Sequence, residues 1–139
     1  MRRASDETVR AVLTTYAVWA VVGLSGNRAR PAWGVAHWLQ EQGKQVVPVH
    51  PRAEPVHGQP AYPTLADVPF PVDVVDLFVR SELAGAVVDE AVAIGARAVW
   101  MQLGVTDDAA FGRAEAAGLR VVQDDCPHIA GPRLLGWPP

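Results

Sequence analysis

Short continuous apolar runs alternate along the chain with longer segments in which apolar residues recur every three or four positions. A continuous run is typical of a strand that is buried on both faces, whereas the longer spacing is typical of an amphipathic helix. The pattern predicts five strands, at residues 17–22, 45–49, 72–78, 98–103 and 119–123.

Residues that favour helix ends flank the segments with helical spacing. The predicted helix starts are Ser5, Pro31, Ser81 and Asp107, and the predicted ends include Gly43, Ala93 and Gly118. Thr64 is expected to cap a single helical turn, after an irregular proline- and glycine-rich connection at residues 50–63. The residues after the fifth strand are expected to form a proline-rich tail.

Strands separated by helices require right-handed crossovers and a mainly parallel sheet. The sequence therefore predicts an α/β fold, a Rossmann-like three-layer sandwich with a mainly parallel five-stranded sheet and helices on both faces. Its length of 139 residues, half of them apolar, is expected to form a single domain over residues 1–139.

Composition excludes several classes of partner. Twelve basic and 15 acidic residues give a formal charge of -3, which offers no general attraction to nucleic acid or to an anionic membrane. No apolar run approaches the roughly 20 residues of a membrane span, and we expect a cytoplasmic protein. Cys126 is the only cysteine, so an internal disulfide is excluded, and no Cys/His cluster has the spacing of a zinc site.

The turn after the first strand carries the chemistry of a phosphate site. Gly23 and Ser25 are small residues in this turn, and Arg28 and Arg30 precede the helix that begins at Pro31. The unpaired amides of a helix start, together with the helix dipole, attract an anion. The spacing differs from Gly-x-Gly-x-x-Gly, and no acid ends the second strand to hold a ribose, so NAD binding is disfavoured.

In a parallel sheet the loops after the strands meet at one edge and form a ligand crevice where the strand order reverses. Together these loops resemble the standalone coenzyme A-binding domain proteins, which are related to the nucleotide-binding domain of the succinyl-CoA ligase alpha subunit. The resemblance spans nearly the whole chain. It is carried by Val22-Gly23-Leu24-Ser25, Arg28, Arg30-Pro31, Val47-Pro48-Val49-His50-Pro51, residues 62–69, residues 74–82, Trp100-Met101-Gln102-Leu103-Gly104-Val105 and Cys126-Pro127.

The resemblance implies that coenzyme A or an acyl-CoA lies along this crevice. It places one group of residues near the phosphates: Gly23, Leu24, Ser25, Arg28 and Arg30. It places a second group beside the nucleotide: Val49, Pro51, Phe78 and Arg80. His50 directly follows the second strand, where its imidazole could replace an amide donor as a ligand contact; a simple loop role is the alternative. Gln102 and Gly104 would line the path of the pantetheine arm.

Three positions depart from the family pattern. His50 stands where an Asn is usual, Val79 replaces an Arg, and Asp125 precedes Cys126 where an Arg is common. Each difference removes or alters a polar contact, and the loss of one cation near a phosphorylated ligand costs about 1 kcal/mol.

No catalytic residues are predicted. Ser25 lacks a Gly-x-Ser-x-Gly elbow and a base placed to activate it, so its hydroxyl is interpreted as a phosphate contact. His37 is expected to have a structural role, packed or partly exposed, and His57 and His128 are expected at the surface. Cys126 follows two acids, which raise a thiol pKa, so burial is favoured over redox chemistry; a mixed disulfide with coenzyme A is a further hypothesis.

These features predict a binding, sensing or delivery module without a catalytic centre of its own. A small nucleotide-dependent oxidoreductase or transferase that uses the same crevice is the enzyme alternative. A third possibility is an interaction protein without a ligand, in which exposed Trp19, Trp33 or Trp137 forms a contact patch, for instance in a homo-oligomer.

Overall fold

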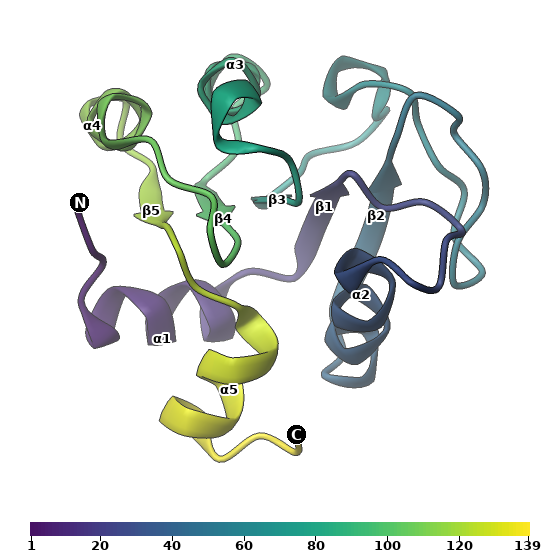
Figure 1. Cartoon of the computed structure of the whole chain (residues 1–139), viewed down its shortest axis with the longest axis horizontal. Coiled ribbons are helices and arrows are strands. Elements are labelled where there is room, and N and C mark those ends of the chain that lie inside the picture. The colour runs from purple at the N-terminus through teal and green to yellow at the C-terminus, as the bar shows by residue number, and fades with distance from the viewer.

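The computed structural model describes residues 1–139 and has an α/β fold built on one five-stranded parallel sheet (Figure 1). The strands are β1 (Val18–Val22), β2 (Gln45–Val49), β3 (Val74–Leu77), β4 (Ala98–Met101) and β5 (Arg120–Val122). The helices are α1 (Asp6–Thr15), α2 (Pro31–Glu41), α3 (Ser81–Ala93), α4 (Asp108–Ala116) and α5 (Pro127–Leu135), with a 3₁₀ turn, η1 (Leu65–Asp67).

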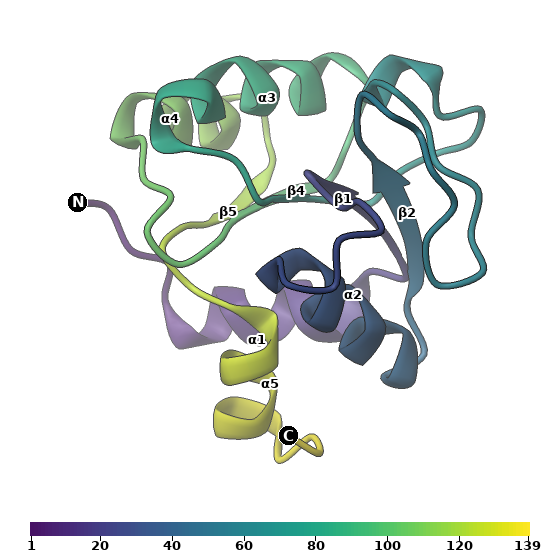
Figure 2. The ribbon, with the colours of Figure 1, turned by 45° about the vertical axis from the view of Figure 1, so that its right-hand side comes forward.

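The sheet has the order β2-β1-β3-β4-β5, and every neighbouring pair of strands is parallel. Helices α1, α2 and α5 cover one face, and α3 and α4 cover the other (Figures 1 and 2). The three-layer Rossmann-like fold predicted from the sequence is therefore confirmed. Between β1 and β3 the chain changes direction across the sheet, and this switch point is where such folds open a crevice.

Two tryptophans lie at the centre of the core beneath α1, α2 and α5. Trp19 of β1 and Trp100 of β4 are fully buried, with ring centroids 5.8 Å apart. Each indole N–H donates to a backbone oxygen, that of Tyr16 for Trp19 and that of Asp125 for Trp100, so neither buries an unpaired donor. Burial of Trp19 removes it from the contact patch that the interaction-protein alternative considered.

The predicted strands are all present, and four of them are shorter by one or two residues at one or both ends. Ser5 caps α1 as expected, because its side chain accepts a hydrogen bond from Thr8 N at 3.1 Å. The prediction for the third helix start is wrong by one residue. Arg80 is the N-cap of α3, and Ser81 is its first residue. The Ser81 hydroxyl instead donates to the oxygen of Gly104, at 3.1 Å.

The expected proline-rich tail contains a helix, α5, which the sequence pattern did not predict. Pro127 occupies its first turn, where a missing N–H costs nothing, but Pro132 lies inside the helix. Tertiary packing compensates for this. Gly131 lies against Trp38 of α2, where a Cβ would come within 2.6 Å of the ring, and the Trp38 indole donates to Pro138 O at 2.8 Å.

Candidate functional site

The carboxyl ends of the three central strands lie in register at the switch point. Val22 of β1 pairs with Val49 of β2 on one side and with Leu77 of β3 on the other. The chain leaves these strands through Gly23 and Phe78, whose amides donate to Val49 O at 2.8 Å and to Val22 O at 2.9 Å. The loops that follow β1 and β3 are therefore held against each other at the mouth of the crevice.

Gly23 is required by this contact. Its φ of +97° lies in the left-handed region, and a Cβ built on it would collide with the carbonyl oxygen of Phe78. An L side chain there would be strained in its backbone and would also push the two loops apart. The sequence pattern singled out Gly23 as a small residue, and the structure supplies the physical reason.

Hydrogen bonds within the turn after Gly23 shape the approach to α2. The Ser25 hydroxyl accepts from Asn27 N at 3.2 Å, and the Asn27 side chain accepts from Ala29 N at 3.0 Å. Arg30 is the N-cap of α2 and makes no side-chain capping bond, and the first turn contains no acidic residue. The positive end of this helix is therefore left uncompensated by the chain itself.

Three arginines in the loops after β1 and β3 have no carboxylate partner. Arg28, Arg30 and Arg80 are exposed, and none of them belongs to an ion pair. The guanidinium carbon of Arg28 lies 5.3 Å from the ring centroid of Trp33, a cation–π distance that favours one orientation of the side chain. In contrast, Arg52, which follows β2, lies 4.0 Å from Glu54.

The end of β2 contributes mainly backbone groups to the candidate site. Val49 is buried, and Pro51 is exposed. His50 donates its backbone N–H to Tyr62 O, and its Nδ1 accepts from Arg52 N at 3.1 Å, so one ring nitrogen is used to form the turn. The Leu24 side chain is also fully buried, in the core beneath α2. Only the backbone of Leu24 is left to face a ligand.

The loop after β4 is tied to its neighbours through Gly104. The Gly104 amide donates to Asp124 Oδ1 at 2.8 Å, and its φ is +78°. Gln102, buried at the end of β4, donates from Nε2 to Asp76 Oδ1 at 2.7 Å. The structure thus places Gln102 and Gly104 at the same edge of the sheet as the turn after β1.

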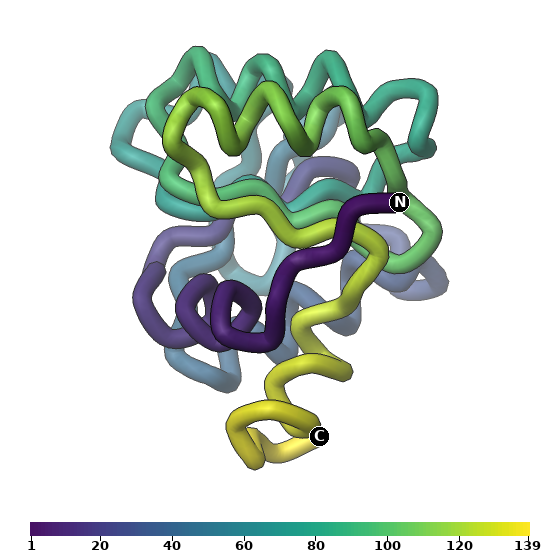
Figure 3. The backbone as a smooth tube through the Cα atoms, turned by 90° about the vertical axis from the view of Figure 1, so that its left-hand side faces the viewer, coloured from purple at the N-terminus to yellow at the C-terminus, as the bar shows by residue number.

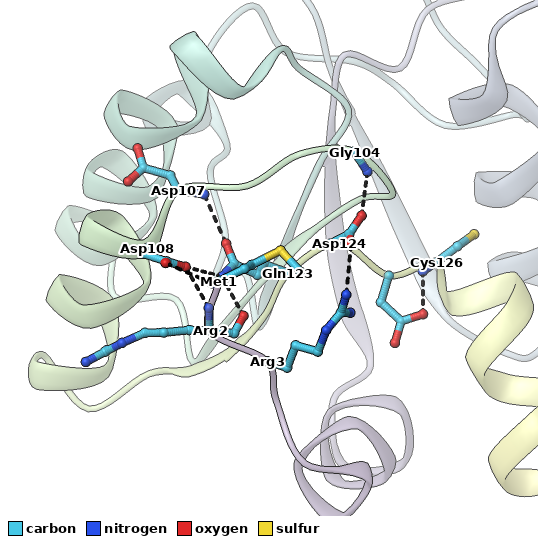
Figure 4. A network of polar contacts seen from close by, with 10 residues as sticks. Met1, Arg2, Arg3, Gly104, Asp107, Asp108, Gln123, Asp124 and Cys126 are labelled. Atoms are coloured by element: carbon cyan, nitrogen blue, oxygen red, sulfur yellow. Dashed lines mark hydrogen bonds and ion pairs between the residues drawn. The ribbon is translucent and has the colours of Figure 1, made fainter.

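A polar network that the sequence analysis missed fastens the N-terminal segment beside this loop (Figure 4). Gln123 is buried and donates to Arg2 O at 2.6 Å and to Asp108 Oδ1 at 2.8 Å, while its Oε1 accepts from Asp107 N at 3.0 Å. Arg3 lies 3.6 Å from Asp124, the residue that holds Gly104. In Figure 3 the N-terminal segment passes beside the connection from β5 to α5. The signal in the sequence that could have indicated this network was Gln123, a polar residue at the end of a predicted strand.

Burial changes the acid–base properties of three groups near the ends of β3 and β5. It raises the pKa of Asp76 to about 7, against the lowering effect of the hydrogen bond from Gln102. Burial also raises the pKa of the Cys126 thiol, and the charges of Asp76 and Asp125 add to that rise. The pKa of Asp125 is raised mainly by burial as well. The prediction that Cys126 is buried is confirmed.

The histidines pack against tryptophans. His37 is exposed, with its ring stacked on that of Trp33. The expectation of surface positions for the other two is wrong in part, because both are half-buried. His57 Nε2 donates to Trp33 O at 2.7 Å, and His128 stacks on Trp38 with ring centroids 4.8 Å apart. No group of three or more His, Cys, Asp or Glu residues is arranged to hold a metal ion.

Two hollows lie beside the N-terminal segment. One of about 470 Å³ and one of about 200 Å³ flank the N-terminal segment, and both are lined in part by Arg3 and Ala4. These hollows lack the unpaired helix terminus and the free arginines of the switch point. None of the helices combines the length and the apolar character needed to cross a membrane.

A doubly wound parallel sheet with helices on both faces defines a Rossmann-like domain. Comparison with known families is more specific. Residues 17–132 match the CoA binding domain family, and the chain belongs to that family.

Its relatives include proteins of similar length. The uncharacterized protein YneT of Bacillus subtilis (strain 168) is 29% identical over 130 residues, which are 94% of this chain and 96% of the relative. A hypothetical protein from Pyrococcus horikoshii OT3 has a structure with 38% identity and a TM-score of 0.90, and the match covers 98% of each chain.

A larger protein contains a similar domain. The dinucleotide-forming acetyl-coenzyme A synthetase 1 of Ca. Korarchaeum cryptofilum is 25% identical, with a TM-score of 0.71. The match covers 84% of this chain but 28% of the synthetase. This chain therefore resembles one part of that enzyme.

Proposed function

We propose that the chain binds coenzyme A or an acyl-CoA in the crevice at the carboxyl ends of the strands, as a binding, sensing or delivery module without its own catalytic centre. The observation that carries the proposal is the N-terminus of α2, which has no side-chain cap, together with three arginines in the loops after β1 and β3, Arg28, Arg30 and Arg80, that have no acidic partner. Such a site gains hydrogen bonds and charge neutralisation from a phosphate.

The charge of the whole chain makes this local arrangement decisive. With a formal charge of -3, the protein repels a multiply charged anion at long range, so affinity must come from the crevice itself. Coenzyme A carries its phosphates at the adenosine end, which matches the side of the crevice where the three arginines lie. The arm of the ligand would then extend toward Gln102 and Gly104.

The family and its relatives support this choice of ligand. The matching family is named for CoA binding, and the synthetase with a similar domain is named for acetyl-coenzyme A. The geometry also supports a role for Ser25 other than that of a nucleophile. Its hydroxyl accepts a hydrogen bond from Asn27 N within its own turn and has no hydrogen bond to a base. A bound ligand would be held and presented rather than converted.

Calorimetric titration tests the proposal. We expect coenzyme A and acetyl-CoA to bind, with dephospho-CoA weaker and NAD and ATP weaker still, because only the first two carry both the 3′-phosphate and the arm. Preference for NAD over coenzyme A would indicate the oxidoreductase alternative. Binding of none of these ligands would overturn the proposal and favour an interaction protein.

A further inference from the structure

Asp76 is the only buried carboxylate of the chain. It belongs to the central strand β3, between Val21 of β1 and Trp100 of β4, one residue before the strand ends at Leu77. Because side chains alternate along a strand, Asp76 shares the face of Val74, which packs in the core with α1, α2 and α5. A carboxyl group is thus placed in an apolar layer at the switch point.

Half of the hydrogen-bonding capacity of Asp76 is unused. Its Oδ1 accepts from Gln102 Nε2 at 2.7 Å, whereas Oδ2 is shielded from solvent and has no partner. It is the one buried side-chain oxygen or nitrogen of the chain in this condition. Buried polar atoms are almost always paired, so an orphaned oxygen at the edge of a crevice indicates a partner that arrives with a ligand.

The neighbours of Asp76 do not supply that partner. Val21 and Trp100 flank it in the sheet, and the Trp100 indole N–H already donates to Asp125 O. Cys126, at the start of α5, is the titratable group whose pKa responds to the charge of Asp76, and its thiol makes no hydrogen bond to the carboxylate. No basic side chain pairs with Asp76 to hold its charge.

We propose that Oδ2 of Asp76 accepts a hydrogen bond from a neutral donor, an amide N–H or a hydroxyl group, on the pantetheine arm of the ligand. This inference rests on the proposed function and assigns that arm its recognition residue. Gln102 is 5% exposed and bonded to Oδ1 of Asp76. The proposal places the entering donor beside this side chain, at Oδ2.

Charge decides which part of the ligand Asp76 can meet. A buried carboxylate repels a phosphate, so the adenosine-phosphate end is excluded from this position and belongs with the arginines. The arm has two amides and one hydroxyl group and no charge. An acceptor that has lost its water is most selective for such groups, because a ligand without the donor leaves the oxygen unpaired.

Binding of the pantetheine arm at Asp76 should release protons to the solvent, and this release can be measured. Because burial raises the pKa of Asp76 to about 7, the carboxyl is partly protonated in the free protein at neutral pH. A hydrogen-bond donor on Oδ2 favours the ionised form of Asp76, so binding of the arm releases that proton. We expect the release of about half a proton per ligand at pH 7.

Calorimetry in two buffers of different ionisation enthalpy, PIPES and Tris, neither of which contains phosphate, measures this release. The probes are coenzyme A and adenosine 3′,5′-bisphosphate, which has the phosphates of one end but lacks the arm. The proteins are the wild type, Asp76→Asn, and Asp89→Asn as a matched control, since Asp89 is exposed on α3 and pairs with Arg113. Thermal melts confirm that each variant is folded.

We expect coenzyme A to release protons from the wild type and from Asp89→Asn but not from Asp76→Asn, whose affinity for coenzyme A falls about tenfold. Adenosine 3′,5′-bisphosphate should bind all three proteins alike. Equal proton release by Asp76→Asn and the wild type, or unchanged affinity for coenzyme A, would overturn the role of Asp76 alone. Absence of coenzyme A binding to the wild type would overturn the proposed function, and this inference with it.

Discussion

The carbonyl oxygen of Phe78 occupies the space that a side chain on Gly23 would need. This contact brings the turn after β1 against the loop after β3, and the crevice opens from that point. The two residues are far apart in the sequence, and their contact depends on β1 and β3 being neighbours in the sheet.

Gly23→Ala should therefore both destabilise the fold and weaken coenzyme A binding. The new methyl group meets the Phe78 carbonyl, and the φ of +97° strains any L residue, so we expect a loss of about 1–3 kcal/mol in the free energy of unfolding. Urea denaturation and calorimetry measure the two effects. Gly34→Ala is the control, because Gly34 lies in α2 with open space around it and should gain up to about 1 kcal/mol.

Arg28→Ala should lower the affinity for coenzyme A about fivefold, since one partly exposed charge pair contributes about 1 kcal/mol to the binding free energy. If Arg28 meets the 3′-phosphate, dephospho-CoA loses less affinity than coenzyme A; equal losses place the side chain at the pyrophosphate. Arg10→Ala removes the same charge from the exposed surface of α1, where Arg10 has no ion pair. An equal effect of both substitutions would contradict a local role for Arg28.

The stability of the free protein should fall as the pH rises from about 4 to about 7 through the titration of Asp76. Its folded pKa of about 7 exceeds the ordinary carboxyl value, so the folded chain keeps a proton that the unfolded chain releases in this window. The contribution is at most about 4 kcal/mol, at about 1.4 kcal/mol per pKa unit.

Urea denaturation at several pH values measures this dependence. Asp76→Asn has no carboxyl to titrate, so its stability should decline less over the same range and should exceed that of the wild type at pH 8. A pH profile of Asp76→Asn that parallels the wild type would show that Asp76 ionises normally.

Cys126 should react slowly with thiol reagents. The thiol is buried and its pKa is raised, so the reactive thiolate is scarce at pH 7. We expect reaction with a chromogenic disulfide at least about tenfold slower than in the urea-unfolded chain, because burial both shields the thiol and raises its pKa, which lowers the thiolate fraction. Mass spectrometry after treatment with diamide and coenzyme A tests the mixed disulfide directly, and absence of an adduct at Cys126 would exclude it.

Gln123→Leu should destabilise the chain by about 1–3 kcal/mol, because it leaves Arg2 O and Asp107 N without their buried partner. Arg3→Ala removes an exposed ion pair with Asp124 and should cost less than about 1 kcal/mol. Chemical denaturation compares the two variants. A larger effect for Arg3→Ala would mean that the ion pair, rather than the buried amide, fastens the N-terminal segment.

Local pattern accounts for most of the fold. Buried apolar runs and the residues at helix ends predicted five strands and α1 to α4, because both signals act within a few residues of the chain. Helix α5 lacked such a signal, since Pro132 disfavours a helix and only contact with Trp38 compensates for it. The burial of Trp19 agrees with the continuous apolar run of its strand and removes this residue from the exposed patch considered for an interaction protein.

For the candidate site, the sequence determined the residue types: a small-residue turn, arginines before a helix start, and polar groups after the strands. Only the tertiary structure decided which of them lack partners. Arg28 and Arg80 are free while Arg52 is paired, and Asp76 has one oxygen bonded to Gln102 and one unpaired. Pairing depends on distances between side chains from different strands, which no local pattern encodes.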